Sequence, residues 1–467
     1  MDIAIYMKRF WTYTAAFLLL TASKASHSKQ IDVEGKIDVS DLVCQSSALA
    51  AKPLYTSNQE VTEPPSLDDL PETFRTKEGL QQKTIPLDIK KQGEILTIGI
   101  WGDSHSAANF FSDELISAIG VSKAQYRPTF IPPTLGKGGI RLPVRKFCKS
   151  NGWSYSIAYS SKGGNSLPYS PALANISNNQ PDASLSIDFR FPDNRPALKN
   201  LTILIKPNSE DAVINLSVDS NAYENIVIPA GDDKITLKSK TNFSIVSITA
   251  ILGTITIEGF LPVYDSESNL HLDTFGIPGA TVRGWKVIDP NYMKDRLQGI
   301  NYDLVILEYG TNEGADKNFD SVTYKEMLDA GLKKFKAVFP NAQCILIGPT
   351  DRGMLVKRQT KKQLPKVKQS KIGLANQAKS IKYVELLKYS QVHQKISDIQ
   401  SKSADEYGCK FWSWQTTMGG IGGAYKWYYR SPRLMGKDLI HLTIPGYQES
   451  ARSFIESINL KNVINNK

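Results

Sequence analysis

Cysteine, histidine and long hydrophobic runs are all scarce in this 467-residue sequence, which has four cysteines and five histidines. Four cysteines are too few for a disulfide scaffold, and no CxxC or clustered Cys/His spacing indicates a zinc site. Beyond the N-terminal region, no apolar run has the roughly 20 residues that a bilayer-spanning helix needs. What remains is a globular protein, because 41% hydrophobic residues are enough to form real cores.

The first 26 residues predict a secretory signal. Lys8 and Arg9 precede an apolar run from Phe10 to Leu20, and residues 23–25 provide a small-residue cleavage site. An uncleaved anchor is the alternative, but the apolar run is short for a bilayer span and no cysteine follows it to carry a lipid. We therefore expect an exported protein.

The four cysteines lie in two kinds of sequence surroundings. Cys344 and Cys409 lie in the runs AQCILIG and GCKFWSW, which predict buried strands, so we expect both to be free thiols in the core. Export permits a disulfide between Cys44 and Cys148, but the sequence does not decide whether it forms.

The formal net charge is +10, and part of it is concentrated in one segment. Between Lys357 and Lys371 the chain has seven basic residues and no acidic one. Nucleic acid is not the expected partner, because the chain carries an export signal. We interpret the Lys357–Lys371 segment as a solvated basic loop, with attraction to an anionic envelope surface as the functional alternative.

The pattern of apolar residues divides the chain into four parts. Residues 27–93 form a polar, proline-containing lead-in segment that could wrap a core but forms none itself. Residues 94–150 and 266–467 alternate buried strands with amphipathic helices, which is typical of an α/β domain with a parallel sheet. Residues 151–265 contain short alternating strands separated by turn residues, which predicts an inserted antiparallel β-sandwich.

The stretch EILTIGIWGDSHSAANF contains the first candidate catalytic residue. An apolar strand ends near Gly102, and apolar residues recur at helical spacing from Ala107 onward, so Ser104 lies on a strand-to-helix turn. Such turns at the carboxyl end of a strand present reactive groups in α/β proteins. Ordinary turn and cap chemistry is the alternative interpretation of Gly-Asp-Ser.

A serine nucleophile needs a base, and His441 is the best candidate among the five histidines. His441 precedes a helix that Thr443 is expected to cap, so it lies on a loop. Asp438, three residues earlier, can meet the imidazole Nδ1–H while Nε2 faces the serine. The position of His441 near the C-terminus lets the last loop return to the first strand.

Two further segments provide candidate oxyanion donors. Asn312 follows a buried strand that ends near Tyr309, so its side-chain amide is expected at the same sheet edge as Ser104. Gly279 lies in FGIPGATVRGW and offers an accessible backbone N–H. Each residue taken alone is equally compatible with a plain turn.

Together these segments resemble the SGNH/GDSL hydrolase superfamily, with its four blocks at Gly102–Asp103–Ser104, Gly279, Gly310–x–Asn312 and Asp438–x–x–His441. The resemblance implies a three-layer α/β/α fold with a parallel sheet, Ser104 as nucleophile, His441 as base and Asp438 as its orienting residue. It also implies an oxyanion hole built from the Ser104 and Gly279 N–H groups and the Asn312 amide. His105 departs from the commonest motif, which has leucine there.

Further features are similar to one branch, the peptidoglycan O-acetylesterases and related O-acetyltransferases of Gram-negative periplasms. These features are His105, the insert between the first two blocks, and the segments RLPVRKF and FWSWQTTMGG. In that branch the insert resembles a carbohydrate-binding module. Trp412 and Trp414 alternate on an expected strand, so they pack in the core or, alternatively, form a sugar platform.

The resemblance implies a serine esterase that removes O-acetyl groups from peptidoglycan or a related polysaccharide in the periplasm, with no metal and no cofactor. An O-acetyltransferase with the same triad and a catalytically inactive carbohydrate-binding protein are the alternatives. Esterases of lipids or of xylan-like polysaccharides remain a third possibility.

Overall fold

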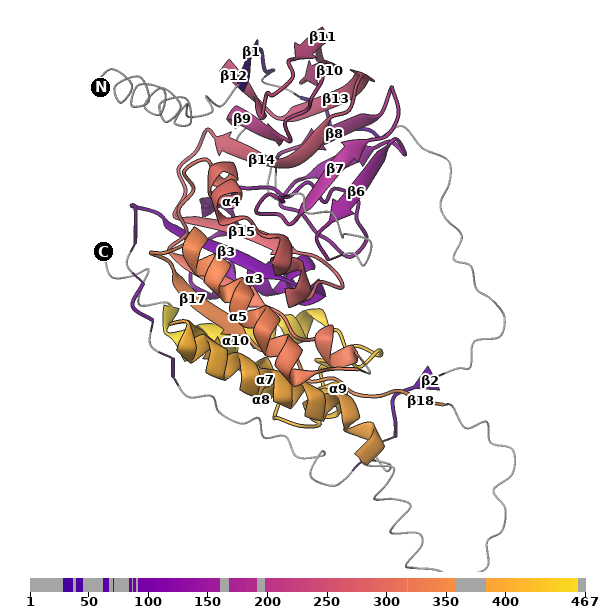
Figure 1. Ribbon diagram of the computed structural model, residues 1–467, viewed down its shortest axis with the longest axis vertical. Helices are drawn as coiled ribbons and strands as arrows, with labels where there is room; N and C mark the ends of the chain where they lie inside the picture. Colours follow the sequence, from indigo (N-terminus) through magenta and orange to yellow (C-terminus); the bar gives the residue numbers. More distant parts are fainter. Residues whose placement is uncertain are drawn as a thin grey trace, which may run out of the picture.

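The structure is a computed structural model of the 467-residue chain (Figure 1). The predicted signal segment and most of the Lys357–Lys371 segment lie outside the residues that the structure describes. The described residues are 28–36, 39–44, 62–66, 70, 84–85, 87–89, 91–159, 168–190, 198–316, 318–357 and 384–460.

A six-stranded parallel sheet positions the candidate site, with strands in the order β19-β17-β16-β3-β15-β4. The first of these strands in the chain, β3, lies in the interior of the sheet between β15 and β16. The chain thus builds outward on both sides of β3, which makes the carboxyl end of β3 the point where ligands bind in sheets of this kind. The strands are β3 (Leu96–Gly102), β4 (Tyr126–Arg127), β15 (Leu270–Gly276), β16 (Leu304–Glu308), β17 (Gln343–Ile347) and β19 (Lys410–Trp412).

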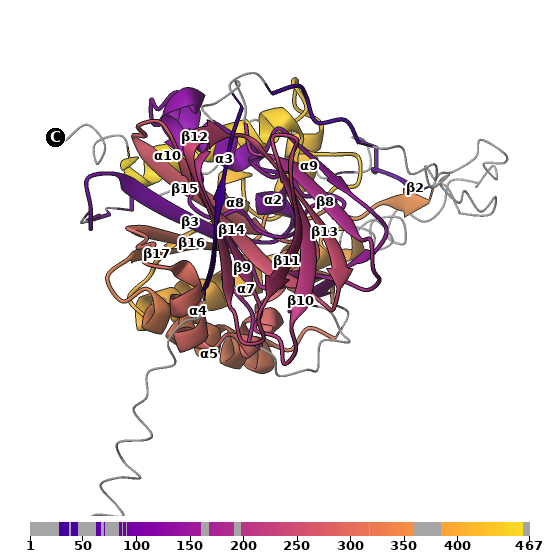
Figure 2. The ribbon, with the colours of Figure 1, turned by 90° about the horizontal axis from the view of Figure 1, so that it is seen from above.

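Helices cover both faces of the parallel sheet, and Figure 2 shows α3 and α10 on one side and α4, α5 and α7 on the other. Side chains of β3 alternate between two hydrophobic clusters: Ile98 and Ile100 pack towards α3 and α10, and Trp101 packs towards α5. Within the described residues, no helix is both long and apolar enough to cross a membrane. The helices are α3 (Phe110–Ala118), α4 (Pro290–Leu297), α5 (Ser321–Val338), α7 (Lys388–Glu406) and α10 (Ile444–Ile458).

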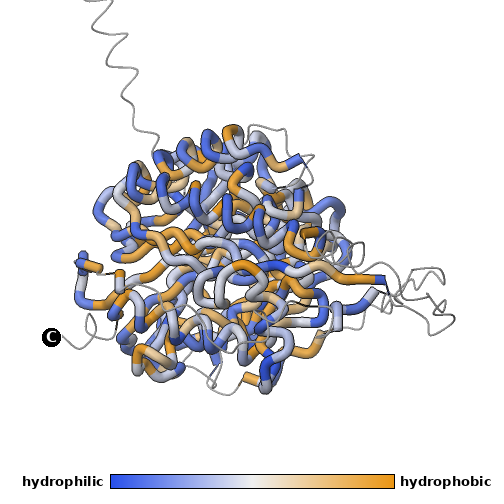
Figure 3. The backbone as a smooth tube through the Cα atoms, turned by 90° about the horizontal axis from the view of Figure 1, so that it is seen from below, coloured by the Kyte–Doolittle hydropathy of each residue, from blue (hydrophilic) through white to orange (hydrophobic). Residues whose placement is uncertain are grey.

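The burial of this part of the chain follows the predicted pattern. All seven residues of β3 and all five of β16 are buried, as expected for strands covered on both faces. In Figure 3 hydrophobic segments gather in the middle of the molecule, between outer segments of mixed colour. The predicted α/β class with a parallel sheet is confirmed, and Thr443 caps α10 as expected, accepting a hydrogen bond from the Gly446 N–H.

Two further sheets lie beside the parallel sheet (Figure 1). Their inner faces share one hydrophobic cluster that contains Leu201, Ile203, Ile214 and Ile248. The first has the order β1-β12-β9-β14-β7-β6 and the second β11-β10-β13-β8-β5. The bounds are β1 (Ser28–Val33), β5 (Lys146–Lys149), β6 (Trp153–Ile157), β7 (Ala174–Asn178), β8 (Ser184–Asp188), β9 (Leu198–Ile205), β10 (Ala212–Val218), β11 (Asn221–Ile228), β12 (Lys234–Phe243), β13 (Ile245–Leu252) and β14 (Thr256–Tyr264).

Two strands of these sheets come from outside residues 151–265. β5 precedes that range and pairs with β8, whereas β1 lies in the polar lead-in segment and pairs in parallel with β12. Val33 at the end of β1 is buried in the shared cluster. The lead-in segment, which we expected to form no core, therefore contributes an edge strand and a core residue to this region.

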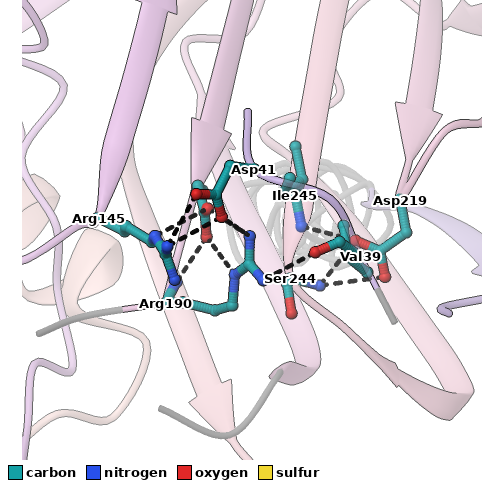
Figure 4. Close-up of polar contacts among 8 residues, drawn as sticks. Val39, Asp41, Arg145, Arg190, Asp219, Ser244 and Ile245 are labelled. Carbon is teal, nitrogen blue, oxygen red and sulfur yellow. Dashed lines mark hydrogen bonds and ion pairs between the residues drawn. The ribbon is translucent and has the colours of Figure 1, made fainter. Parts of the chain in front are cut away.

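Beyond β1 the chain is held by polar contacts that Figure 4 shows. The carbonyl of Val39 accepts a hydrogen bond from Arg190 (3.1 Å), and Asp41 forms an ion pair with Arg145 (2.9 Å). Arg190 also pairs with the buried Asp188 of β8 (2.7 Å). We call residues 28–36 and 39–44 together the N-terminal strap, because they run from the edge of one sheet to the edge strand of the other.

The N-terminal strap ends in a covalent link. Cys44 forms a disulfide with Cys148 of β5, a pairing that the sequence had left open. The expectation of free thiols at Cys344 and Cys409 is wrong, because these two residues are also joined by a disulfide. Cys344 lies in β17 and Cys409 immediately precedes β19, and the parallel pairing of these strands brings the two Cα atoms to 4.6 Å.

The two tryptophans of FWSW pack in the core. Trp412 ends β19, but the expected strand does not continue, because α8 (Trp414–Thr417) begins two residues later. Both rings are fully buried, and the Trp414 Nε1–H donates to Ser450 Oγ (2.8 Å). Neither ring is available as a sugar platform.

Replacing Cys344 and Cys409 together by alanine is expected to lower the free energy of unfolding by about 2–4 kcal/mol, because the disulfide closes a long loop in the unfolded chain. Urea unfolding of the oxidised protein and the double variant checks this. Equal midpoints for the two proteins would show that the link contributes nothing to stability.

Candidate active site

The turn after β3 places Ser104 at the sheet edge. Gly102 ends the strand, Asp103 caps the short helix α2 (Ser104–Ala107) by accepting from the His105 N–H (2.9 Å), and Ser104 opens that helix. A Cβ at Gly102 would lie 2.3 Å from Ser106 Oγ, so the tight turn requires glycine there. The predicted strand-to-helix turn is confirmed.

His441 and Asp438 meet this turn from the last loop of the domain. Ser104 Oγ lies 3.0 Å from His441 Nε2, and His441 Nδ1 lies 2.7 Å from Asp438 Oδ2. The three residues that the sequence singled out are therefore in hydrogen-bond contact in the order that nucleophilic catalysis needs. The side chains of His441 and Asp438 are 47% and 46% exposed, so the site is open to solvent.

The loop that carries Asp438 and His441 also sets the protonation states of these two residues. Partial burial would raise the pKa of Asp438, but hydrogen bonds from the His441 side chain and from the N–H groups of Ile440 (3.1 Å) and His441 (3.0 Å) hold it at about 2. The hydrogen bond to Asp438 raises the pKa of His441 above its ordinary value. Asp438 is therefore ionised at neutral pH and favours the imidazolium form of His441.

Three other histidines make different contacts. His105 is fully buried, with Nδ1 3.0 Å from the Tyr447 hydroxyl and Nε2 3.2 Å from Thr350 Oγ1, and burial lowers its pKa to about 3. His271 lies in β15 and contacts Ser268. His393 lies in α7, and its side chain is buried where this helix packs against the sheet. His27 lies outside the described residues.

Asn312 lies at the same sheet edge, as predicted. Its Nδ2 donates to Ala280 O (2.9 Å) and to Asp103 Oδ2 (3.2 Å), so its amide lies between the turn after β15 and the turn that carries Ser104. The next residue, Glu313, accepts from the Val282 N–H (2.8 Å) and ties the two loops together.

Gly279 lies in the turn after β15. The Ala280 N–H donates to Ile277 O (3.0 Å), and Gly279 has a φ of +81°. This conformation follows Pro278 and favours glycine, as in a type II turn. A Cβ at Gly279 would meet nothing within 4 Å, so the residue faces open space.

Two buried acids, Asp103 and Glu308, lie behind Ser104. Glu308 Oε2 accepts from the Asp103 N–H (3.2 Å) and from Ser106 Oγ (3.0 Å). Burial raises the pKa of Asp103 to about 6 and that of Glu308 well above its ordinary range. The only sequence signal for this contact is an acid that ends an otherwise apolar strand. Over the described residues, no group of three or more His, Cys, Asp or Glu side chains could hold a metal ion.

No protein-family model and no curated protein matches this sequence. Among solved structures, the chain is similar to one described as "Peptidoglycan O-acetylesterase in action, 5 min", with a TM-score of 0.53 and 19% identity over 80% of this chain and 93% of that chain. The chain thus shares the fold of that protein. This likeness of fold agrees with the resemblance drawn from the four sequence blocks.

Other structural neighbours are more distant. A putative GDSL-like lipase from Parabacteroides merdae has a TM-score of 0.26 and 17% identity over 41% of this chain and 73% of that chain. A family two carbohydrate esterase from Clostridium thermocellum, in complex with cellohexaose, has a TM-score of 0.26 and 9% identity over 67% of this chain and 99% of that chain.

Gly276→Ala tests how Ser104 is held. A Cβ at Gly276 would lie 2.2 Å from the backbone nitrogen of Ala107, so β15 and α2 must separate. We expect a loss of about 1–3 kcal/mol of stability and, because Ser104 moves, a fall in kcat/KM of about tenfold or more. Thermal unfolding and ester turnover measure both, and Gly138→Ala, where a Cβ meets nothing within 4 Å, is the matched control.

Asp438→Asn tests the charge of the pair. The change removes the carboxylate that raises the pKa of His441, so the acidic limb of the pH profile of kcat/KM should move to lower pH. The plateau rate should fall about a hundredfold or more, because the imidazolium loses its stabilising charge. A pH profile with an unmoved acidic limb would show that His441 is not the group that titrates.

Proposed function

We propose that the protein is a serine esterase that removes O-acetyl groups from a cell-wall polysaccharide, most directly peptidoglycan. The observation that carries this proposal is the contact chain from Ser104 through His441 to Asp438 at the carboxyl end of β3. The fold shared with a peptidoglycan O-acetylesterase supports the choice of substrate class.

In this mechanism the Ser104 Oγ attacks the carbonyl carbon of the acetyl ester while His441 Nε2 takes its proton. Ionised Asp438 stabilises the imidazolium that forms. His441 then returns the proton to the sugar oxygen as the ester C–O bond breaks, which leaves acetyl-Ser104. Water, deprotonated by His441, attacks this intermediate. His441 then returns the proton to Ser104 Oγ as the acyl C–O bond breaks and acetate leaves.

The oxyanion of each tetrahedral intermediate would be held by the N–H groups of Ser104 and Gly279 and by the Asn312 amide. Of the two contacts that Asn312 Nδ2 makes, the 3.2 Å contact with Asp103 is longer than the 2.9 Å contact with Ala280 O. The longer one is the contact that an oxyanion would share. A Cβ at Gly279 would meet nothing within 4 Å, so the space beside this residue has room for a bound ester.

We further propose that the two-sheet region is an inserted β-sandwich module that holds the polysaccharide chain, with the active site on the α/β domain beside it. Its own hydrophobic cluster supports this assignment. The export signal predicted from the first 26 residues supports a periplasmic location. The Lys357–Lys371 segment would favour approach to an anionic envelope surface.

The test is acetate release from O-acetylated peptidoglycan and from a small acetyl ester by the wild-type protein and by Ser104→Ala. We expect Ser104→Ala to reduce release from both substrates to background, since its nucleophile is absent. Ser117→Ala, which changes an exposed serine of α3, is the control and should retain full activity.

The outcomes separate the alternatives. Release of acetate that is the same with Ser104→Ala as with the wild type would contradict the proposal. Turnover of the small ester without release from peptidoglycan would shift the function towards acetyl transfer or another polysaccharide. No turnover together with binding to peptidoglycan would favour a carbohydrate-binding protein.

A further inference from the structure

One cation beside the proposed triad has no role in the mechanism described above. Arg352 follows β17 on a segment that touches both halves of the site: Thr350 Oγ1 lies 3.2 Å from His105 Nε2, and the Gly353 N–H donates to Leu439 O (3.0 Å). Arg352 is therefore held between the turn of Ser104 and the loop of Asp438 and His441.

The guanidinium of Arg352 forms no ion pair among the described residues, although the Asp438 carboxylate raises its pKa against the larger lowering effect of burial. It stacks on the Tyr389 ring of α7 at 4.6 Å, and its buried Nε has no hydrogen-bond partner in the described part of the chain. The neighbouring Asp351 is occupied elsewhere, because it accepts from Gln415 Nε2 (2.7 Å) and from the Ala424 N–H (2.8 Å). A partly buried guanidinium of this kind is a prepared site for an oxyanion.

The charge of Arg352 also acts on the proposed base. The positive charge of Arg352 lowers the pKa of His441, in opposition to the larger effect of Asp438. It thus works against the imidazolium that the proposed reaction forms. An anion bound to Arg352 would neutralise this charge and so remove its effect on His441.

We propose that Arg352 binds a carboxylate carried by the acetylated sugar and so makes the enzyme selective for acidic glycans. This inference rests on the proposed esterase function and names the substrate group that the same site recognises. The planar guanidinium can donate two parallel hydrogen bonds to a carboxylate, while stacking on Tyr389 fixes its plane.

Two kinds of sugar carry such a group. N-acetylmuramic acid has a free lactyl carboxylate where its stem peptide has been removed, and uronic acids have a carboxylate on the ring. The shared chemistry is a carboxylate near an acetylated hydroxyl. The two kinds of sugar differ in the distance between the carboxylate and that hydroxyl.

The experiment compares acids with their uncharged amides. Acetate release is measured for O-acetylated N-acetylmuramic acid and its lactyl amide, and for an O-acetylated uronic acid and its amide. We expect the wild type to prefer one acid over its amide. Arg352→Met should lower that acid-to-amide ratio of kcat/KM by about tenfold or more, mostly through KM, because a hydrogen-bonded charge pair is lost.

Arg433→Met is the matched control, because Arg433 also stacks on a tyrosine, Tyr428, at 4.2 Å, but is exposed. It should keep the wild-type ratio, and Arg352→Lys should recover part of it. Binding without turnover is measured as the affinity of the Ser104→Ala variant for N-acetylmuramic acid, with and without Arg352→Met. Thermal unfolding shows that the variants are folded.

The result that overturns the proposal is a wild-type ratio near one for both sugars, or an equal loss on acid and amide with Arg352→Met. Either result would leave Ser104-dependent acetate release intact. Absence of that release from every ester would instead overturn the proposed function itself. The two failures are therefore distinguishable.

Discussion

The contact between Ser104 Oγ and His441 Nε2 joins residues 337 positions apart, and the rest of the domain serves to hold it at 3.0 Å. Ser104 depends on the central strand β3, whereas His441 depends on the loop before α10. The packing of α3 against α10 brings these two ends of the domain together, since both helices share the hydrophobic cluster that lies under β3. Much of the core on that face thus fixes the relative positions of Ser104 and His441.

The ionisable groups around this contact fall into two layers. Behind Ser104, burial raises the pKa of Asp103 and Glu308 and lowers that of His105, so each of these side chains is biased towards its neutral form. In front, Asp438 and His441 are half exposed, and hydrogen bonds favour their charged forms. Charge is therefore concentrated on the Asp438–His441 pair in front of Ser104.

The sequence predicted the parts of the site that follow from local pattern. The turn that carries Ser104 follows from an apolar run that ends at Gly102, and the Asp438–His441 pair follows from spacing on one loop. The Cys344–Cys409 disulfide could not be predicted, because it depends on which two strands are neighbours in the sheet. The same holds for Glu308 and Arg352, whose surroundings are built by segments far away in the chain.

Sequence also misjudged where some side chains face. His393 lies in an α7 segment that is polar enough to suggest a surface, yet the ring is buried and its Nδ1 lies 2.6 Å from Thr350 O. Trp414 belongs to a helix and not to the expected strand, since Ser413 caps α8 by accepting from the Thr416 N–H. In both cases a short polar contact fixes the local geometry, and such a contact cannot be predicted from hydrophobic periodicity.

The N-terminal strap has a consequence for the order in which the chain can fold during synthesis. β1 is made first among the described strands, yet its partner β12 ends at Phe243, so β1 must wait until more than two hundred further residues have been added. β3 likewise waits for β15 and β16, and the candidate site waits for α10. A chain that emerges N-terminus first can thus complete the two-sheet region while the parallel sheet still lacks its last strands and helix. The two-sheet region can then fold first, and the later part of the chain can pack against it.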